Sequence, residues 1–209
     1  MKIHQKKMAL IDIRHFSPGT ILGLWQISES TAEFYLKYSY LSIYREEVDL
    51  KFRSDNRKKE FLAIRALLHE IYPDDTPFVS HELSGKPILS NGYNVSISHT
   101  NGYAVLIVSE KDAVAVDIEY RSDRVSKVAN KFIREDEEAP DVLSQLINWS
   151  AKETVYKYFS SDNLEYFQMK MHHIQPANKG CVTIENMKRS TSVSVHYEIT
   201  EAYVLTYMP

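Results

Sequence analysis

Residues 114–119 read VAVDIE. Successive side chains of a β-strand point to opposite faces, so the apolar residues at 114, 116 and 118 share one face, and Ala115, Asp117 and Glu119 share the other. Two steps of roughly 3.3 Å put the Cα atoms of the two acidic residues about 6–7 Å apart. The pattern predicts either a solvated acidic strand face or a carboxylate pair that binds one hard cation through oxygen ligands.

A second stretch combines a tryptophan, a carboxylate and an ammonium. Residues 149–157 read WSAKETVYK. On a helix, Trp149, Glu153 and Lys157 are four residues apart and share one face. Glu153 and Lys157 alone would be typical of a surface ion pair. Trp149 indicates that the face is partly buried, where a carboxylate and an ammonium need a partner or a ligand.

Two shorter motifs carry basic side chains. Residues 94–100 read NVSISHT, which predicts a strand that ends at His99 between hydroxyl side chains. An imidazole there can bind a phosphate oxygen, although a single histidine is more often structural. Residues 85–87 read GKP and place Lys86 in a tight turn, which by itself is a common surface feature.

The remaining pattern predicts an α+β fold in two halves, residues 1–110 and 111–209. A metal site at the acidic pair of residues 117 and 119 would lie in the second half. We expect helices at 30–38, from about Arg57 to the residue before Pro73, at about 125–133 and at 143–159. We expect strands at 8–13, 21–27, 93–98, 103–109, 113–119, 181–184, 193–199 and 203–207. The short polar turn 110–112 predicts that strands 103–109 and 113–119 form a hairpin.

Composition excludes several classes of protein. The 209 residues include 25 Lys and Arg against 28 Asp and Glu, a formal net charge of −3, so no broad basic surface for nucleic acid is expected. A hydrophobic content of 44% excludes a disordered chain. Cys181 is the only cysteine, which excludes an internal disulfide and favours a reducing, cytoplasmic location.

Neither a secretory signal nor a membrane partner is expected. The charged start at residues 1–7 resembles the beginning of a signal peptide, but Asp12 and Arg14 interrupt the apolar stretch that follows. The longest apolar run, residues 103–108, is far shorter than the roughly 18 residues that span a bilayer.

In this order and spacing, the four motifs resemble those of the 4′-phosphopantetheinyl transferase superfamily, in its long pseudodimeric (surfactin-synthetase-activating) branch. The resemblance covers about residues 57–159. Its most specific part is the D-x-E strand with the W-x-x-K-E helix thirty residues later. The matching motifs are G-K-P at 85–87, S-H-[ST] at 98–100, D-x-E at 114–119 and W-x-x-K-E-x-x-x-K at 149–157.

The resemblance implies a fold of two similar α+β halves with pseudo-twofold symmetry, and a monomer. It implies a Mg²⁺-dependent holo-[acyl-carrier-protein] synthase. Such an enzyme transfers 4′-phosphopantetheine from coenzyme A to a serine of an apo acyl or peptidyl carrier protein, and releases adenosine 3′,5′-bisphosphate. The carrier would belong to fatty-acid or secondary-metabolite biosynthesis, and the sequence does not specify which.

The resemblance also implies roles for individual residues. Asp117, Glu119 and Glu153 would hold Mg²⁺. Glu153 would serve as the base for the carrier serine, and Lys157 would bind the phosphate beside the reacting phosphorus, with help from Lys152. The rest of the coenzyme would be bound by Arg57, Arg65, Lys86, Pro87, Ser98 and His99.

Two departures from the family pattern and two alternatives remain. Ala115 stands where the family usually has glycine, and residues 160–163 replace a turn that often contains glycine and lysine. The first fifty residues carry no recognisable motif. One alternative is a metal-dependent phosphohydrolase that acts on a nucleotide-like substrate with the same acidic cluster. The other is a non-catalytic relative that binds coenzyme or carrier.

Overall fold

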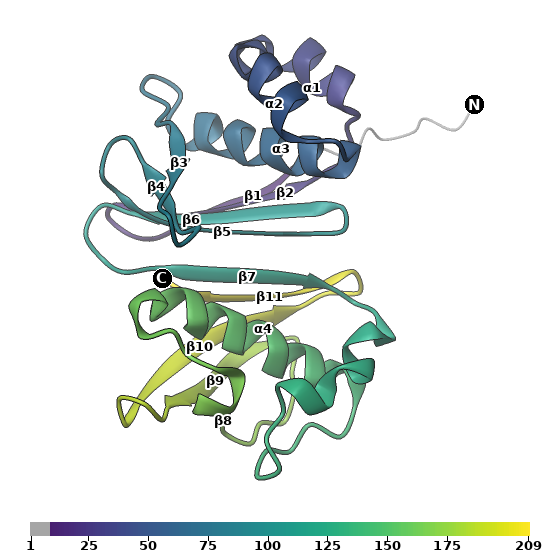
Figure 1. Ribbon diagram of the computed structural model, residues 1–209, viewed down its shortest axis with the longest axis vertical. Helices are drawn as coiled ribbons and strands as arrows, with labels where there is room; N and C mark the ends of the chain where they lie inside the picture. The colour runs from purple at the N-terminus through teal and green to yellow at the C-terminus, as the bar shows by residue number, and fades with distance from the viewer. Residues whose placement is uncertain (1–8) are drawn as a thin grey trace.

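A computed structural model describes residues 9–209 of the chain. Two antiparallel sheets pack face to face, and helices cover their outer faces (Figure 1). The first sheet has the order β1 (Leu10–Ser17), β2 (Thr20–Gln26), β6 (Tyr103–Ser109), β5 (Asn94–Thr100). The second has the order β7 (Ala115–Tyr120), β11 (Tyr203–Met208), β10 (Thr191–Ile199), β9 (Lys179–Asn186), β8 (Met169–Met171). The predicted α+β fold is confirmed. The boundary expected at 110/111 falls between the two sheets, and residues 1–8 of the first predicted half and strand lie outside the described residues.

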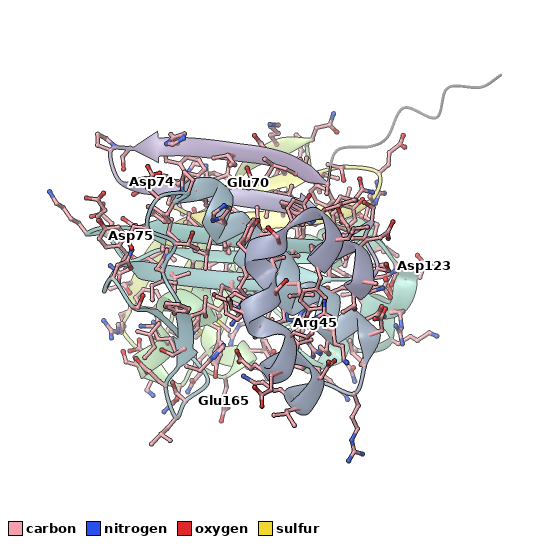
Figure 2. The ribbon with its side chains drawn as sticks, turned by 90° about the horizontal axis from the view of Figure 1, so that it is seen from above. Arg45, Glu70, Asp74, Asp75, Asp123 and Glu165 are labelled. Carbon is pink, nitrogen blue, oxygen red and sulfur yellow. The ribbon has the colours of Figure 1, made fainter. Side chains whose placement is uncertain are left out.

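Within residues 9–209, three α-helices cover the first sheet, and one covers the second (Figure 1). The first three are α1 (Thr31–Lys37), α2 (Arg45–Lys51) and α3 (Asp55–Ile71), and Figure 2 looks down on them with the strands behind. The helix α4 (Val142–Tyr158) packs on β7 and β11. A small hairpin, β3 (Val79–His81) with β4 (Pro87–Leu89), stands beside the first sheet. The short 3₁₀ turns are η1 (Ser39–Tyr44), η2 (Asp123–Lys127), η3 (Ala129–Lys131), η4 (Ser160–Asp162) and η5 (Tyr166–Gln168).

Three of the four predicted helices are present within residues 9–209, as α1, α3 and α4, whereas α2 was not predicted. At the start of α1, the Ser30 hydroxyl accepts a hydrogen bond from the Glu33 amide, while the Glu33 carboxylate accepts one from the Ser30 amide. The end of α3 is at Ile71, before Pro73, and α4 lies within one residue of its expected bounds. No helix within residues 9–209 is long and apolar enough to cross a membrane.

The described residues form three hydrophobic cores that hold the layers together. One lies between α3 and the first sheet, and another lies between α4 and the second sheet. The third lies between the sheets, where Leu24 and Ile107 face Val116 and Leu205. The apolar side chains of β7 point into this third core, as their alternation predicts, so the acidic side chains of β7 face α4.

Two local predictions are wrong. The strands β6 and β7 do not form a hairpin: β6 pairs with β2 on one edge and β5 on the other, so it has no free edge, and β7 pairs with β11 in the second sheet. A single helix over 125–133 is also absent. Val128 has a φ of −125°, outside the helical region, and divides this segment into η2 and η3.

Hydroxyl side chains join the two sheets where β5 runs beside β7. Three hydroxyls at alternate positions of β5 accept hydrogen bonds from backbone N–H groups of β7. In a regular sheet, backbone carbonyls of the neighbouring strand would accept these bonds. This ladder fixes the register of β5 against the strand that carries the acidic pair. Its bonds are Val116 to Ser96 at 3.1 Å, Ile118 to Ser98 at 3.4 Å and Tyr120 to Thr100 at 3.2 Å.

Candidate active site

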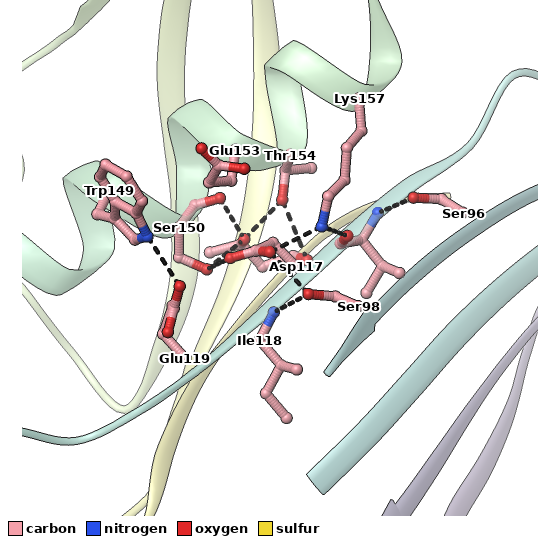
Figure 3. Close-up of polar contacts among 12 residues, drawn as sticks. Ser96, Ser98, Asp117, Ile118, Glu119, Trp149, Ser150, Glu153, Thr154 and Lys157 are labelled. Atoms are coloured by element: carbon pink, nitrogen blue, oxygen red, sulfur yellow. Dashed lines mark hydrogen bonds and ion pairs between the residues drawn. The ribbon is translucent and has the colours of Figure 1, made fainter. Parts of the chain in front are cut away.

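Three carboxylates gather between β7 and α4 (Figure 3). Asp117 and Glu119 come from the face of β7 that points to α4, and Glu153 comes from the middle of α4. Burial, and then repulsion from Asp117 and Glu153, raise the pKa of Glu119 to about 7. Burial also raises the pKa of Glu153. The site therefore concentrates negative charge that a bound cation would stabilise.

Each glutamate is held by one aromatic hydrogen-bond donor. Trp149 Nε1 donates to Glu119 Oε1 at 2.8 Å, and Tyr166 Oη donates to Glu153 Oε1 at 2.6 Å. Among residues 9–209, no other hydrogen bond reaches either carboxylate, so the second oxygen of each is available. Carboxylate oxygens are the ligands that Mg²⁺ takes. These two glutamates fit a hard cation, although no described group of three acidic, histidine or cysteine side chains closes around a single metal position.

Asp117 is enclosed more fully than the glutamates, and its side chain is only 5% exposed. Its Oδ1 accepts from Ser98 Oγ and from Lys157 Nζ, each at 2.8 Å, and its Oδ2 accepts from Ser150 Oγ at 2.8 Å. Lys157 also donates to the carbonyl of Val116 at 3.0 Å. The Lys157 ammonium thus balances the charge of Asp117, and both Asp117 oxygens are already bonded. Asp117 is therefore less available to a cation than the glutamates.

A cleft of about 570 Å³ opens beside this cluster, between the first and second halves. Lys86 and Pro87 line it from the β3–β4 hairpin, Ser96 from β5 and Lys157 from the end of α4. Lys157 therefore touches both the cleft and the acidic cluster. Three of the side chains predicted to bind the coenzyme, namely Lys86, Pro87 and Lys157, meet here.

A second basic group consists of Arg57 on α3 and His99 on β5. Arg57 Nη1 is 3.1 Å from His99 Nε2, and Glu60 Oε2 is 3.3 Å from His99 Nδ1. Burial lowers the pKa of His99, and so do the charges of Arg57 and Lys157. His99 and Arg57, both of which the resemblance assigned to the coenzyme, contact each other, but they lie outside the cleft lining, as does Ser98. Ser98 is instead occupied by the ladder and by Asp117.

The structure corrects the prediction that Arg65 contacts the coenzyme. Arg65 is only 6% exposed, its guanidinium carbon lies 3.3 Å from the centre of the Phe61 ring, and it donates to the Phe61 carbonyl. Burial lowers its pKa to about 10. Eight residues along α3 separate it from Arg57 by about 12 Å and a rotation of about 80°. Arg65 therefore packs in the first core and does not join Arg57 and His99.

Lys152 also lies elsewhere, which corrects its assignment to the catalytic group. Its side chain and that of Glu137 are both 0% exposed, and Lys152 Nζ donates to Glu137 Oε2 at 2.7 Å and to the Phe132 carbonyl at 2.6 Å. Adjacent helix positions differ by about 100° in direction, so Lys152 points away from the side of α4 that carries Glu153. Lys152 holds the segment before α4 in place.

Sequence reasoning missed three residues of this region. Ser150 lies within the W-x-x-K-E motif, and Glu137 lies in the acidic stretch before α4, so both were visible as polar residues without an assigned partner. Tyr166 follows the motif by nine positions and has no sequence signal.

Comparison with known proteins gives one family. No curated protein matches the chain. Residues 113–208 match the model of the 4′-phosphopantetheinyl transferase superfamily. The match contains the three carboxylates and Lys157, whereas the first-half wall of the cleft, with Lys86, precedes it. The half of the chain that holds the acidic cluster therefore supports placing the protein in the 4′-phosphopantetheinyl transferase superfamily.

Proposed function

We propose that the protein transfers the 4′-phosphopantetheine group of coenzyme A to a serine of an apo acyl or peptidyl carrier protein. The observation that carries this proposal is the position of Lys157, which lines the cleft and also bonds Asp117 of the acidic cluster. A phosphate group bound at Lys157 would thus lie next to the carboxylates. The family match supports transfer of phosphopantetheine over other chemistry of such a cluster.

The reaction forms one bond and breaks one bond. The serine Oγ attacks the phosphorus that bears the pantetheine arm, the bond from that phosphorus to the bridging pyrophosphate oxygen breaks, and adenosine 3′,5′-bisphosphate leaves. We assign Glu153, or a water that it orients, to accept the serine proton. Burial raises the pKa of Glu153, which makes it a stronger base than an exposed glutamate. Lys157 would stabilise negative charge on the phosphate groups.

We propose Mg²⁺ as the metal, with Glu119 and Glu153 as its main ligands and Asp117 as the third. In proteins Mg²⁺ is usually bound by one or two carboxylates, substrate phosphates and several waters, which suits two glutamates that each offer one oxygen. When bound, the ion would neutralise charge that builds on the phosphates. We place coenzyme A in the cleft against Lys86 and Pro87, with Arg57, Ser98 and His99 near its phosphate groups.

We further propose that the protein belongs to the long branch of the superfamily and acts as a cytoplasmic monomer. The chain supplies both walls of the cleft, from the β3–β4 hairpin and β5 on one side and from α4 on the other. One copy therefore builds the whole site. Cys181, the only cysteine, is free and exposed, which suits a reducing compartment.

The test is a mass measurement on carrier proteins. The protein would be incubated with coenzyme A, Mg²⁺ and a panel of apo carriers from fatty-acid, polyketide and nonribosomal peptide synthesis. We expect one serine of at least one carrier to gain the mass of phosphopantetheine, and Glu153→Gln to prevent the gain. No gain on any carrier with folded protein would refute the proposal. Release of phosphate from coenzyme A without a carrier would indicate a phosphohydrolase instead.

Alanine substitutions should separate residues that bind the coenzyme from those that act on the reacting phosphate. Lys86→Ala and His99→Ala should raise the KM for coenzyme A roughly tenfold with little change in kcat, because contacts at the adenosine end are the same in the ground and transition states. Lys157→Ala should lower kcat on the order of a hundredfold, because charge changes beside it. Steady-state kinetics at saturating carrier measure both quantities.

Dephospho-coenzyme A, which lacks the 3′-phosphate, serves as the control ligand. The unmodified protein should use it poorly, and Lys86→Ala and His99→Ala should discriminate against it less. Variants that keep the full preference for the 3′-phosphate would place these two residues elsewhere on the coenzyme.

A further inference from the structure

Tyr166 lies outside every motif of the sequence, yet it contacts the centre of the candidate site. Its Oη donates to Glu153 Oε1 at 2.6 Å, and its ring lies beside that of Trp149, with ring centres 5.1 Å apart. Trp149 in turn donates to Glu119, as Figure 3 shows. Two neighbouring aromatic side chains therefore each donate one hydrogen bond to one of two neighbouring glutamates.

The segment that carries Tyr166 is fixed to the rest of the second half. It begins with residues 160–163, which stand in place of the family's usual turn after the last motif. Side-chain and backbone contacts fasten residues 160–168 to the β9–β10 hairpin and to the loop before α4, so the ring of Tyr166 has a defined position. These contacts are Arg189 and Asn186 to the Asp162 carboxylate, Arg134 to the Phe167 carbonyl and the Met187 amide to the Gln168 carbonyl.

The hydroxyl of Tyr166 is directed at the Glu153 carboxylate. A tyrosine hydroxyl carries its proton at neutral pH and can therefore donate it to a carboxylate. Glu153 accepts no other hydrogen bond from residues 9–209. Without Tyr166 its carboxylate would be free to rotate.

We propose that Tyr166 is a positioning residue: it holds Glu153 by one oxygen and leaves the other for a divalent cation, as Trp149 does for Glu119. The inference rests on the proposed function, because it takes Glu153 as a metal ligand. Hydrogen-bond partners of metal ligands orient them, and their loss typically costs about 10–100-fold in metal affinity or activity.

The test compares Tyr166→Phe with Tyr35→Phe. Tyr35 lies on α1 in the first half, and its buried hydroxyl has no hydrogen-bond partner within residues 9–209. Both variants lose one hydroxyl group. Binding of Mn²⁺ is measured from the electron paramagnetic resonance signal of the free ion, with Mn²⁺ alone and with coenzyme A present. We expect Tyr166→Phe to weaken binding at least tenfold and Tyr35→Phe to change it less than twofold.

Kinetics give a second readout that a role in folding alone would not produce. Tyr166→Phe should lower kcat about tenfold or more while the KM for coenzyme A stays within twofold. Equal Mn²⁺ affinity in Tyr166→Phe and the unmodified protein would overturn the inference, and so would a variant that fails to fold or an unmodified protein that binds no Mn²⁺. If the unmodified protein binds Mn²⁺ but modifies no carrier, the proposed function fails, and the Mn²⁺ comparison still decides the role of Tyr166.

Discussion

Glu119→Gln is expected to abolish carrier modification and at the same time to stabilise the metal-free protein. Loss of a charged ligand should reduce turnover at least about a hundredfold. The stability gain arises because the charge of Glu119 is unfavourable in the folded protein. Burial is the largest cause that raises the pKa of Glu119, and repulsion from Asp117 and Glu153 adds to it. Glutamine removes the charge but keeps an oxygen that can accept the hydrogen bond from Trp149.

The gain in stability should depend on pH in a defined direction. The pKa of Glu119 is about 7 in the folded protein and near 4.5 in the unfolded chain, so the folded state disfavours the charged form. This cost is absent below about pH 4, grows as the pH rises and is complete above pH 7. At 1.36 kcal/mol per pKa unit, and with an allowance for partial exposure, it is about 2 kcal/mol.

Urea unfolding at pH 4 and pH 8 in the presence of a chelator measures this difference. Glu119→Gln should be more stable than the unmodified protein at pH 8 and equal to it at pH 4. Glu201→Gln, in the exposed turn before β11, should change stability by less than about 0.5 kcal/mol at either pH. A loss of stability at pH 8 would contradict the electrostatic account. Near-full turnover would remove Glu119 from the proposed ligand set.

Local periodicity predicted the two halves of this site separately. Alternation along residues 114–119 placed Asp117 and Glu119 on one strand face, and the four-residue spacing on α4 placed Glu153 and Lys157 on one helix face. That these two faces meet was implied only by the family resemblance. The partner of β7 was not predictable in this way. A short polar turn favours a hairpin, but β2 and β5 already occupy both edges of β6, and that depends on residues far away in the sequence.

Burial of charged side chains was also beyond local patterns. The family resemblance implied that Arg65 binds the coenzyme and that Lys152 belongs to the catalytic group. Their surroundings are set by tertiary packing: Phe61 and the first core enclose Arg65, and Glu137 encloses Lys152. Tyr166 reaches Glu153 only because distant strands anchor its segment, so no pattern along the chain could indicate it.

Lys152→Met is expected to destabilise the protein by about 3–5 kcal/mol, the usual effect of leaving one partner of a buried ion pair without the other. Methionine fills most of the space of the lysine stem but supplies no charge. The Glu137 carboxylate, 0% exposed, would then keep only its bonds to uncharged donors. These come from the Arg134 and Met171 amides and from Asn148.

Two further variants test this explanation. Adding Glu137→Gln to Lys152→Met should restore much of the lost stability, because no charge then remains buried. Lys127→Met, at an exposed lysine, should have an effect below about 0.5 kcal/mol. The free energy of unfolding in urea measures all three. A double variant as unstable as Lys152→Met alone would show that the buried charge is not the cause.

The same variants decide whether Lys152 takes part in the reaction. Because Lys152 points away from the carboxylates, its replacement should act on turnover only through folding. At a low temperature, where the double variant is folded, kcat per folded molecule should remain within a few-fold of the unmodified protein. A folded double variant whose kcat falls a hundredfold would instead place Lys152 among the catalytic groups. Such a result would imply that the segment around Glu137 moves when the carrier and the coenzyme bind. Lys152 could not turn toward the carboxylates by itself, because Glu137 would then remain buried without its charge partner.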